Sequence, residues 1–103
     1  MTESEFLALA DSALARLEAA LEAADLDFEP GVGGVLEIEF AHGNPMVVNR
    51  HTAAREIWVA ARSGGFHYRW DGAAWRDTRG GEELFAALSR LCSEQAGAVV
   101  TLA

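Results

Sequence analysis

The segment REIWVAARSGGFHYRW, residues 55–70, contains two runs rich in β-branched and aromatic residues, one on each side of Gly64-Gly65. Side chains along a β-strand point to opposite faces with a period of two, so the pattern predicts a β-hairpin that turns at the glycine pair. If Ile57 and Val59 face a core, Trp58 must face water. A chain of 103 residues has room for one core, so leaving its largest apolar side chain outside needs a reason.

The segments around this hairpin predict helices at both ends of the chain. Apolar residues recur at helical spacing over about residues 4–24, with Ser4 as a candidate N-cap, and again over about 82–96. Pro30 and the glycines within 31–34 break the chain before the next regular element. Strands are expected over 35–40, 46–51, 56–62 and 66–70, and a two-residue turn at Asp71-Gly72 leads into a last strand over 73–78.

This order predicts an α/β (α+β) fold in which residues 1–103 form a single domain. A meander of antiparallel strands has one apolar face, and two helices laid on it would bury that face in a two-layer sandwich. The opposite face stays in water and carries Trp58. By the same alternation it also carries Asn49, His51, Arg62, His67 and Arg69.

An exposed tryptophan beside asparagine and arginine is typical of a protein-contact hot spot. The alternative is that Trp58 only packs against its cross-strand neighbours. We expect Asn49 and Trp58 to take part in binding a partner.

The formal net charge of −8 is concentrated in the first part of the chain. Residues 1–40 hold ten acidic residues and one basic residue, Arg16, whereas residues 41–103 hold six acidic residues and seven arginines. Such a surface repels phosphate, so we expect no nucleic acid partner. It favours cations or a basic protein surface.

Four acidic residues recur along one side of the first helix. At about 100° per residue they fall within an arc of about 60° that contains no Lys or Arg, and two more acidic residues follow. The stripe comprises Asp11, Glu18, Glu22 and Asp25, continued by Asp27 and Glu29. Glu18 and Glu22 repel each other at i,i+4 and lie toward the helix C-terminus, where the macrodipole disfavours anions. Either this is an ordinary solvated helix face, or something positive binds there.

Bare carboxylates suit hard cations that prefer oxygen ligands. Side chains spread along a rigid helix cannot surround one ion, so weak, multiple and poorly selective sites are expected. No arrangement of nucleophile and base and no phosphate-binding loop is evident, so the chain is not expected to be an enzyme. The single cysteine, Cys92, lies on an apolar helical stripe as buried filler and suits a cytoplasmic location. No apolar run reaches the ~18 residues of a membrane span, and the N-terminus lacks a signal-peptide pattern.

Several segments together resemble the frataxin family in its bacterial form. They occur in order along nearly the whole chain: SEFLALAD, GGVLEIEF, VVNR followed by IWVAARSGGFHY, Trp75, and RGGEELFAAL. The resemblance implies the same two-layer sandwich. It also implies a cytoplasmic, iron-binding regulator of iron–sulfur cluster assembly that docks on a cysteine desulfurase and an iron–sulfur scaffold protein. An iron carrier or store is the alternative.

By position, the family's iron-binding acidic ridge corresponds to Glu18, Glu22, Asp25, Asp27 and Glu29, with Asp11 on the partner-binding side. The exposed tryptophan of the family's sheet corresponds to Trp58, with Asn49 and Arg50 beside it, so the resemblance implies that Arg50 also binds a partner. We expect weakly bound iron, Fe²⁺ or Fe³⁺, with competition from other divalent cations. We also expect a monomer, with metal-induced oligomers as an open alternative. The chain departs from the family pattern at His51, Ala53 and Glu56. The ridge is also thinner, because Ala19, Ala20, Ala23, Ala24 and Phe28 interrupt it.

Overall fold

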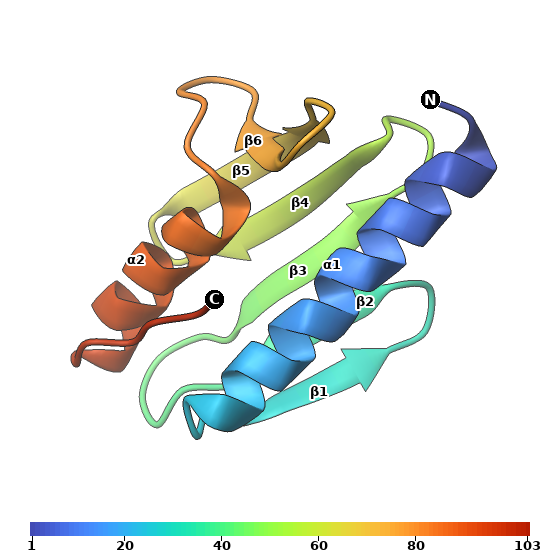
Figure 1. The fold of residues 1–103 in the computed structure, drawn as a ribbon. Helices are drawn as coiled ribbons and strands as arrows, with labels where there is room; N and C mark the ends of the chain where they lie inside the picture. Colours follow the sequence, from blue (N-terminus) through green and yellow to red (C-terminus); the bar gives the residue numbers. More distant parts are fainter.

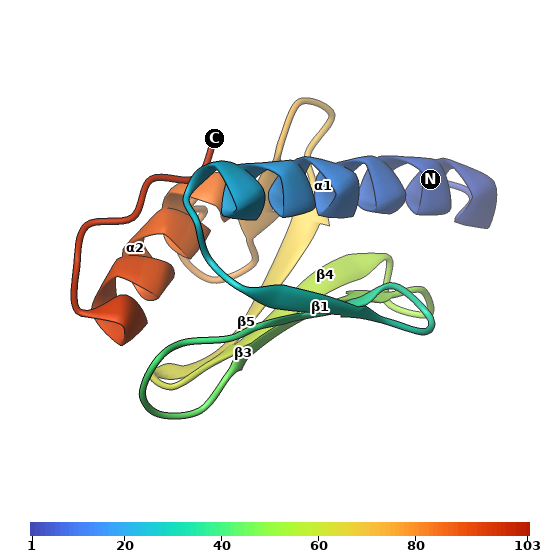
Figure 2. The ribbon, with the colours of Figure 1, turned by 90° about the horizontal axis from the view of Figure 1, so that it is seen from below.

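The computed structural model describes residues 1–103 as two helices and one sheet of six antiparallel strands, ordered β1 to β6. The elements are α1 (Glu3–Ala23), β1 (Phe28–Gly31), β2 (Val35–Ile38), β3 (Met46–His51), β4 (Glu56–Ala61), β5 (Gly64–Trp70), β6 (Trp75–Asp77) and α2 (Leu84–Ala96). Both helices lie on the same side of the sheet (Figure 1). Seen from below, helices and sheet form two layers (Figure 2). The predicted two-layer α/β sandwich is confirmed.

The core lies between the helices and the inner face of the sheet. Alternate residues of β2 to β4 point inward, as their spacing predicts, and meet the apolar stripes of both helices. The largest fully buried side chains include Phe6, Leu17, Leu21, Leu36, Ile38, Ile57, Tyr68, Leu88 and Leu91. Trp75 is also in this core, at 4 % exposure, whereas Trp70 is only half-buried at its rim. The outer face of the sheet is left without a covering layer.

Helix α1 begins with a capping box at Thr2, not with the expected cap Ser4. The backbone N–H of Glu5 donates to Thr2 Oγ1 at 3.1 Å, and the N–H of Thr2 donates to Glu5 Oε1 at 2.9 Å. These two reciprocal bonds satisfy groups that the first helical turn leaves free. The cap therefore lies two residues before the predicted one.

Strand β1 was not predicted, because Pro30 and its neighbouring glycines indicated a break in the chain. Pro30 is tolerated because β1 is the edge strand, where a missing N–H can face solvent. Phe28 pairs with Ile38, and Gly31 pairs with Val35. The chain thus forms a hairpin where a loop was expected.

Three other boundaries differ from the prediction. The β4–β5 turn lies at residues 62–63, because Gly64 already pairs with Ala61. Trp70 pairs with Trp75, so the next loop spans four residues, 71–74, and is held by Asp71 Oδ1, which accepts two backbone N–H bonds at 2.8 Å. The expected strand 35–40 ends at Ile38.

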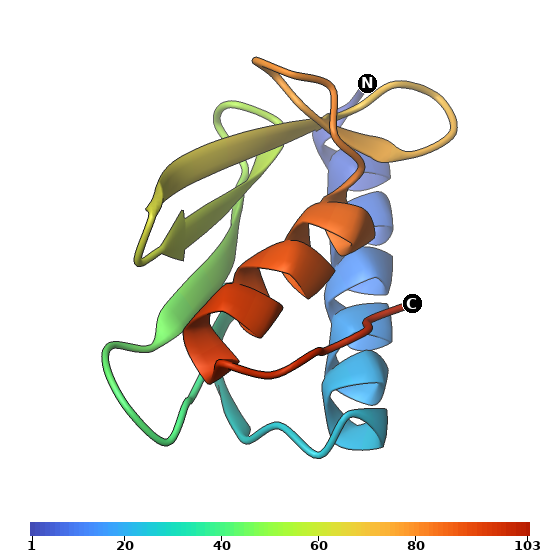
Figure 3. The ribbon, with the colours of Figure 1, turned by 90° about the vertical axis from the view of Figure 1, so that its left-hand side faces the viewer.

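The last residues of the chain cross from α2 toward α1 (Figure 3). Ser89 and Ser93 of α2 hold this tail, because their hydroxyls accept the N–H groups of Leu102 and Val100 at 2.8 Å. Leu102 is buried in the core. Neither helix is both long enough and apolar enough to cross a membrane.

Candidate partner and metal surfaces

Trp58 is the middle ring of an aromatic stack on the outer face of the sheet. Its indole lies between the imidazoles of His51 and His67, with centroid separations of 3.8 and 4.4 Å and nearly parallel planes. The strands place it there, because Trp58 pairs with Asn49 on β3 and with His67 on β5. Trp58 is therefore half-buried and packs against its cross-strand neighbours, as one of the two alternatives in the sequence analysis predicted.

A buried carboxylate, Glu56, fixes this stack. Glu56 is only 6 % exposed although it lies on the outer face. Its oxygens accept hydrogen bonds from Trp58 Nε1 at 2.8 Å and from Arg69 Nε at 2.6 Å, and His67 Nδ1 lies 3.6 Å away. Burial raises the pKa of the Glu56 carboxyl, but these donors outweigh burial and leave the pKa below its ordinary value. Glu56 is thus an ionised anchor for Trp58.

In the sequence, Glu56 is conspicuous only as a departure from a family pattern. The available signal was its spacing of two residues from Trp58, which places both side chains on one face of a strand. His51 and His67 cannot coordinate the same metal ion, because the indole of Trp58 lies between them.

Asp11 is not part of an unneutralised stripe. Arg50 Nη1 of β3 donates to Asp11 Oδ1 and ties the first half of α1 to the sheet. Arg50 is placed by Gly34, where a Cβ atom would lie 2.6 Å from the arginine side chain. Asp11 and Arg50, which the sequence analysis assigns to partner binding, pair with each other in the structure, and their contact with a partner stays a prediction.

The remaining acidic residues of the stripe are without basic partners. None of the carboxylates of Glu18, Glu22, Asp25, Asp27 and Glu29 lies within 4.0 Å of a Lys, Arg or His nitrogen. The six ion pairs of the protein involve other acidic residues. The negative potential at the end of α1 and along the following segment is therefore not compensated from within the chain.

Asp25 occupies an unusual backbone position. It follows the end of α1 with φ of 59°, the left-handed conformation that usually takes glycine. The N–H of Asp25 donates to the carbonyl of Glu22, and the N–H of Leu26 donates to the carbonyl of Leu21, which completes a Schellman motif. A carboxylate at a helix C-terminus also opposes the macrodipole. Asp25 therefore costs stability in two ways.

Glu29 lies on a different face from the helical acids. It pairs directly with Glu37 across β1 and β2, and both side chains point to the outer face because Leu36 and Ile38 point inward. The expected ridge is thus divided into a helical part and a sheet-edge part. Glu37 was not predicted as part of the acidic ridge, because the strand that places Glu29 opposite it was not predicted. Like charges directly opposite on neighbouring strands repel each other.

Asp25 and Asp27 of the ridge also line a hollow of about 300 Å³ between the end of α1 and the segment after β2, together with Glu39. Even so, no group of three His, Cys, Asp or Glu side chains is close enough together to hold one metal ion. The carboxylates can attract cations and basic surfaces, but they do not form a preassembled chelating site.

Cys92 is fully buried in the core, where burial raises the pKa of its thiol to about 11. The thiol is therefore protonated at neutral pH and shielded from reagents. Its position agrees with the predicted role as core filler.

The comparisons with known proteins agree with this geometry. A family model described as a frataxin-like domain matches residues 1–98. The chain is 64% identical to the iron–sulfur cluster assembly protein CyaY of Dechloromonas aromatica, over 99% of each chain. It is 54% identical to the protein of that name from Cupriavidus metallidurans, over 99% of this chain and 96% of the other. The solved structure of frataxin from Psychromonas ingrahamii matches with a TM-score of 0.90 and 30% identity, over 100% of this chain and 99% of that one.

Proposed function

This chain belongs to the frataxin-like family, and we propose that it is an iron-binding regulator of iron–sulfur cluster assembly that docks on a cysteine desulfurase and its scaffold protein. The relatives with 54–64% identity are named iron–sulfur cluster assembly proteins, which supports a role in that process. The docking surface in this proposal is the acidic end of α1 with the β1–β2 edge. The Trp58 stack forms a second contact surface on the outer face of the sheet.

The observation that carries the proposal is the uncompensated charge around Asp25. A residue that costs stability at its own position is expected where binding, not folding, has selected it. Glu18 and Glu22 precede it on the same helix, and Glu29 faces Glu37 nearby. A basic partner surface or bound cations would relieve all of these repulsions at once.

The expected metal chemistry is weak binding of iron. Exposed carboxylates provide one or two oxygen ligands at each place and leave the rest of the coordination shell to water. Calcium and manganese offer similar chemistry to such ligands and should compete with ferrous iron. An iron store would need a denser set of ligands, so the geometry favours the regulator over the carrier or store.

A binding experiment separates the two functions. The desulfurase is immobilised, and this protein is applied with and without ferrous iron in a buffer of fixed ionic strength. The regulator is supported if the protein binds without iron and the double substitution Glu18→Gln with Glu22→Gln weakens that binding. Binding that requires iron supports the carrier.

Two controls sharpen the comparison. Glu3→Gln removes a charge from the opposite end of the same helix, so it should leave binding unchanged. The rate of cluster assembly is then measured at two iron concentrations with and without the protein. A regulator changes the rate at both concentrations, whereas a carrier acts only where iron is limiting.

A further inference from the structure

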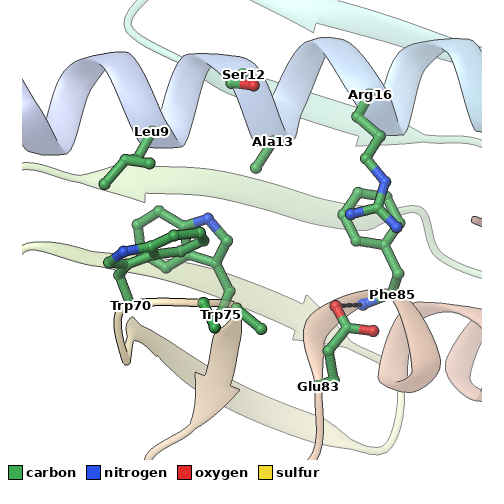
Figure 4. Close-up of a pocket in the computed structure, with 10 residues that line it drawn as sticks. Leu9, Ser12, Ala13, Arg16, Trp70, Trp75, Glu83 and Phe85 are labelled. Atoms are coloured by element: carbon green, nitrogen blue, oxygen red, sulfur yellow. Dashed lines mark hydrogen bonds between the residues drawn. The ribbon is translucent and has the colours of Figure 1, made fainter.

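A pocket of about 260 Å³ lies at the other end of the molecule, between α1, the loop 71–74 and the start of α2. Seven of its ten lining residues are apolar, and Leu9, Trp70 and Trp75 form its apolar wall (Figure 4). The two indoles meet edge to face with centroids 5.6 Å apart. At ~30 Å³ for each water of the liquid, the volume corresponds to about nine waters. This is room for a small molecule, not for a peptide segment.

Arg16 provides the positive charge of this pocket. Its guanidinium carbon lies 3.8 Å from the ring centroid of Phe85, and this contact holds the side chain above the ring (Figure 4). Arg16 makes no ion pair, and its side chain donates no hydrogen bond within the chain. The residues three and four positions away on α1 are Ser12, Ala13, Ala19 and Ala20, so no carboxylate of the helix reaches it. Its donors are available to a ligand.

The indole N–H of Trp75 is a second free donor. Trp75 is 4 % exposed as a whole, and its Nε1 makes no hydrogen bond within the chain, whereas Nε1 of Trp58 does. This nitrogen is not sealed in the core, because the Tyr68 hydroxyl is the one buried side-chain polar atom without a partner, so an acceptor in the pocket can reach it. In the view of Figure 4, this nitrogen lies on the edge of the ring nearer to Arg16. Two donors without acceptors therefore line one apolar pocket.

The acidic residue in the wall does not occupy these donors. Glu83 is the N-cap of α2, and its two oxygens accept the N–H groups of Phe85 and Ala86 at 2.9 and 3.1 Å. The dipole of α2 stabilises its charge at this position. Glu83 therefore stays with the helix and leaves the guanidinium to an incoming anion.

We propose that this pocket binds a small monocarboxylic acid with an aromatic or branched apolar body. The carboxylate pairs with the Arg16 guanidinium, whose planar fork suits two parallel hydrogen bonds, and accepts from Trp75 Nε1. The apolar body lies against Trp70 and Leu9. The site is separate from the acidic surfaces of the proposed function, and its occupation requires neither iron nor a protein partner.

The test is a titration of the full-length ¹⁵N-labelled protein with 3-phenylpropionate, followed by NMR at constant ionic strength. The three indole N–H signals report directly, because Trp70 and Trp75 line the pocket whereas Trp58 lies on the far face of the sheet. The expected result is a saturable shift of the Trp70 and Trp75 signals with the Trp58 signal unchanged. The neutral 3-phenylpropanamide and the ring-free acetate should each bind at least about fivefold more weakly.

Variants then test the role of the guanidinium. Arg16→Gln should weaken the binding of 3-phenylpropionate at least about fivefold, because it removes the charge-assisted pair. Arg16→Lys, which keeps the charge without the fork, should give an intermediate affinity. Arg79→Gln removes the same charge from an exposed residue outside the pocket and should have no effect.

Two outcomes would overturn the proposal. The first is equal binding of acid and amide, which would mean a merely apolar hollow. The second is unaltered binding of the acid by a folded Arg16→Gln protein. A shift of all three indole signals in parallel without saturation would equally rule out a specific site.

Discussion

The indole of Trp58 lies 3.8 Å from the imidazole of His51, centroid to centroid, with 11° between the ring planes. His67 covers its other face, and Nε1 is bound to Glu56. A partner that approaches this side of the sheet therefore meets a rigid stack of three rings, not a freely moving tryptophan. Because such a stack loses little conformational entropy on binding, it is well suited to a protein contact.

Trp58→Ala should lower the free energy of unfolding by about 1–3 kcal/mol, since it leaves buried Glu56 with one donor fewer. Trp75→Ala, at a core position, should cost about 3–5 kcal/mol. Trp58→Ala should nevertheless weaken binding to the desulfurase or scaffold by about 2 kcal/mol, mainly through faster dissociation. Urea melts and surface-binding kinetics measure both effects. Unchanged partner binding by the folded variant would make Trp58 purely structural.

Much of the sandwich could be predicted because alternation and helical spacing are local signals. The inward positions of Ile57, Val59 and Tyr68 follow directly from a period of two, and the structure confirms them. What could not be predicted depends on pairing between distant segments. Pro30 is compatible with a strand only at a sheet edge, and the edge is known only once the strand order is known.

The same limit applies to the candidate sites. The pairing of Asp11 with Arg50 joins residues 39 positions apart, and no local pattern indicates it. Glu37 gains its acidic neighbour Glu29 only through the register of β1 and β2. The division of the acidic ridge into two faces therefore had to come from the structure.

Asp25→Gly should stabilise the protein by about 1 kcal/mol, because glycine adopts positive φ without strain and removes an anion from the helix C-terminus. Asp25→Asn should give part of this gain. Both variants should bind the desulfurase more weakly. Thermal melts and binding measurements on the same samples test the trade-off. A destabilising Asp25→Gly would show that the carboxylate has a structural role.

Tyr68→Phe should leave the protein as stable or make it more stable, by up to about 1 kcal/mol. The Tyr68 hydroxyl is buried without a hydrogen-bond partner, and burial raises its pKa above the ordinary value. Removing the hydroxyl removes an unsatisfied polar group and keeps the ring in place. Urea denaturation of the two proteins is the measurement. A decrease of more than about 1 kcal/mol in the free energy of unfolding would contradict this prediction.

Glu56→Gln should destabilise the protein at pH 7, with a difference from wild type that shrinks in acid. The carboxyl pKa is lower in the folded state, so its contribution is fully present above the unfolded pKa of about 4.3 and is lost as pH falls through the folded pKa. Denaturant melts of both proteins at several pH values from about 3 to about 7 test whether this stability difference shrinks in acid. A difference that stays constant over this range would mean that packing of the side chain, not its charge, matters.

Glu37→Gln should have opposite effects in the absence and presence of divalent cations. Without cations it should raise the melting temperature, because it removes the repulsion between Glu37 and Glu29. With Mn²⁺ or Ca²⁺ the wild type should gain more stability than the variant, since cations that bind the folded state stabilise it by mass action. Glu3→Gln, at the other end of the molecule, should keep the full cation effect.

Calorimetry with divalent cations should give dissociation constants of about micromolar or weaker, at best about −8 kcal/mol, because no three carboxylates converge on one ion. A single nanomolar site selective for iron would contradict this account, since it would require a chelating geometry that these two strands and α1 do not provide.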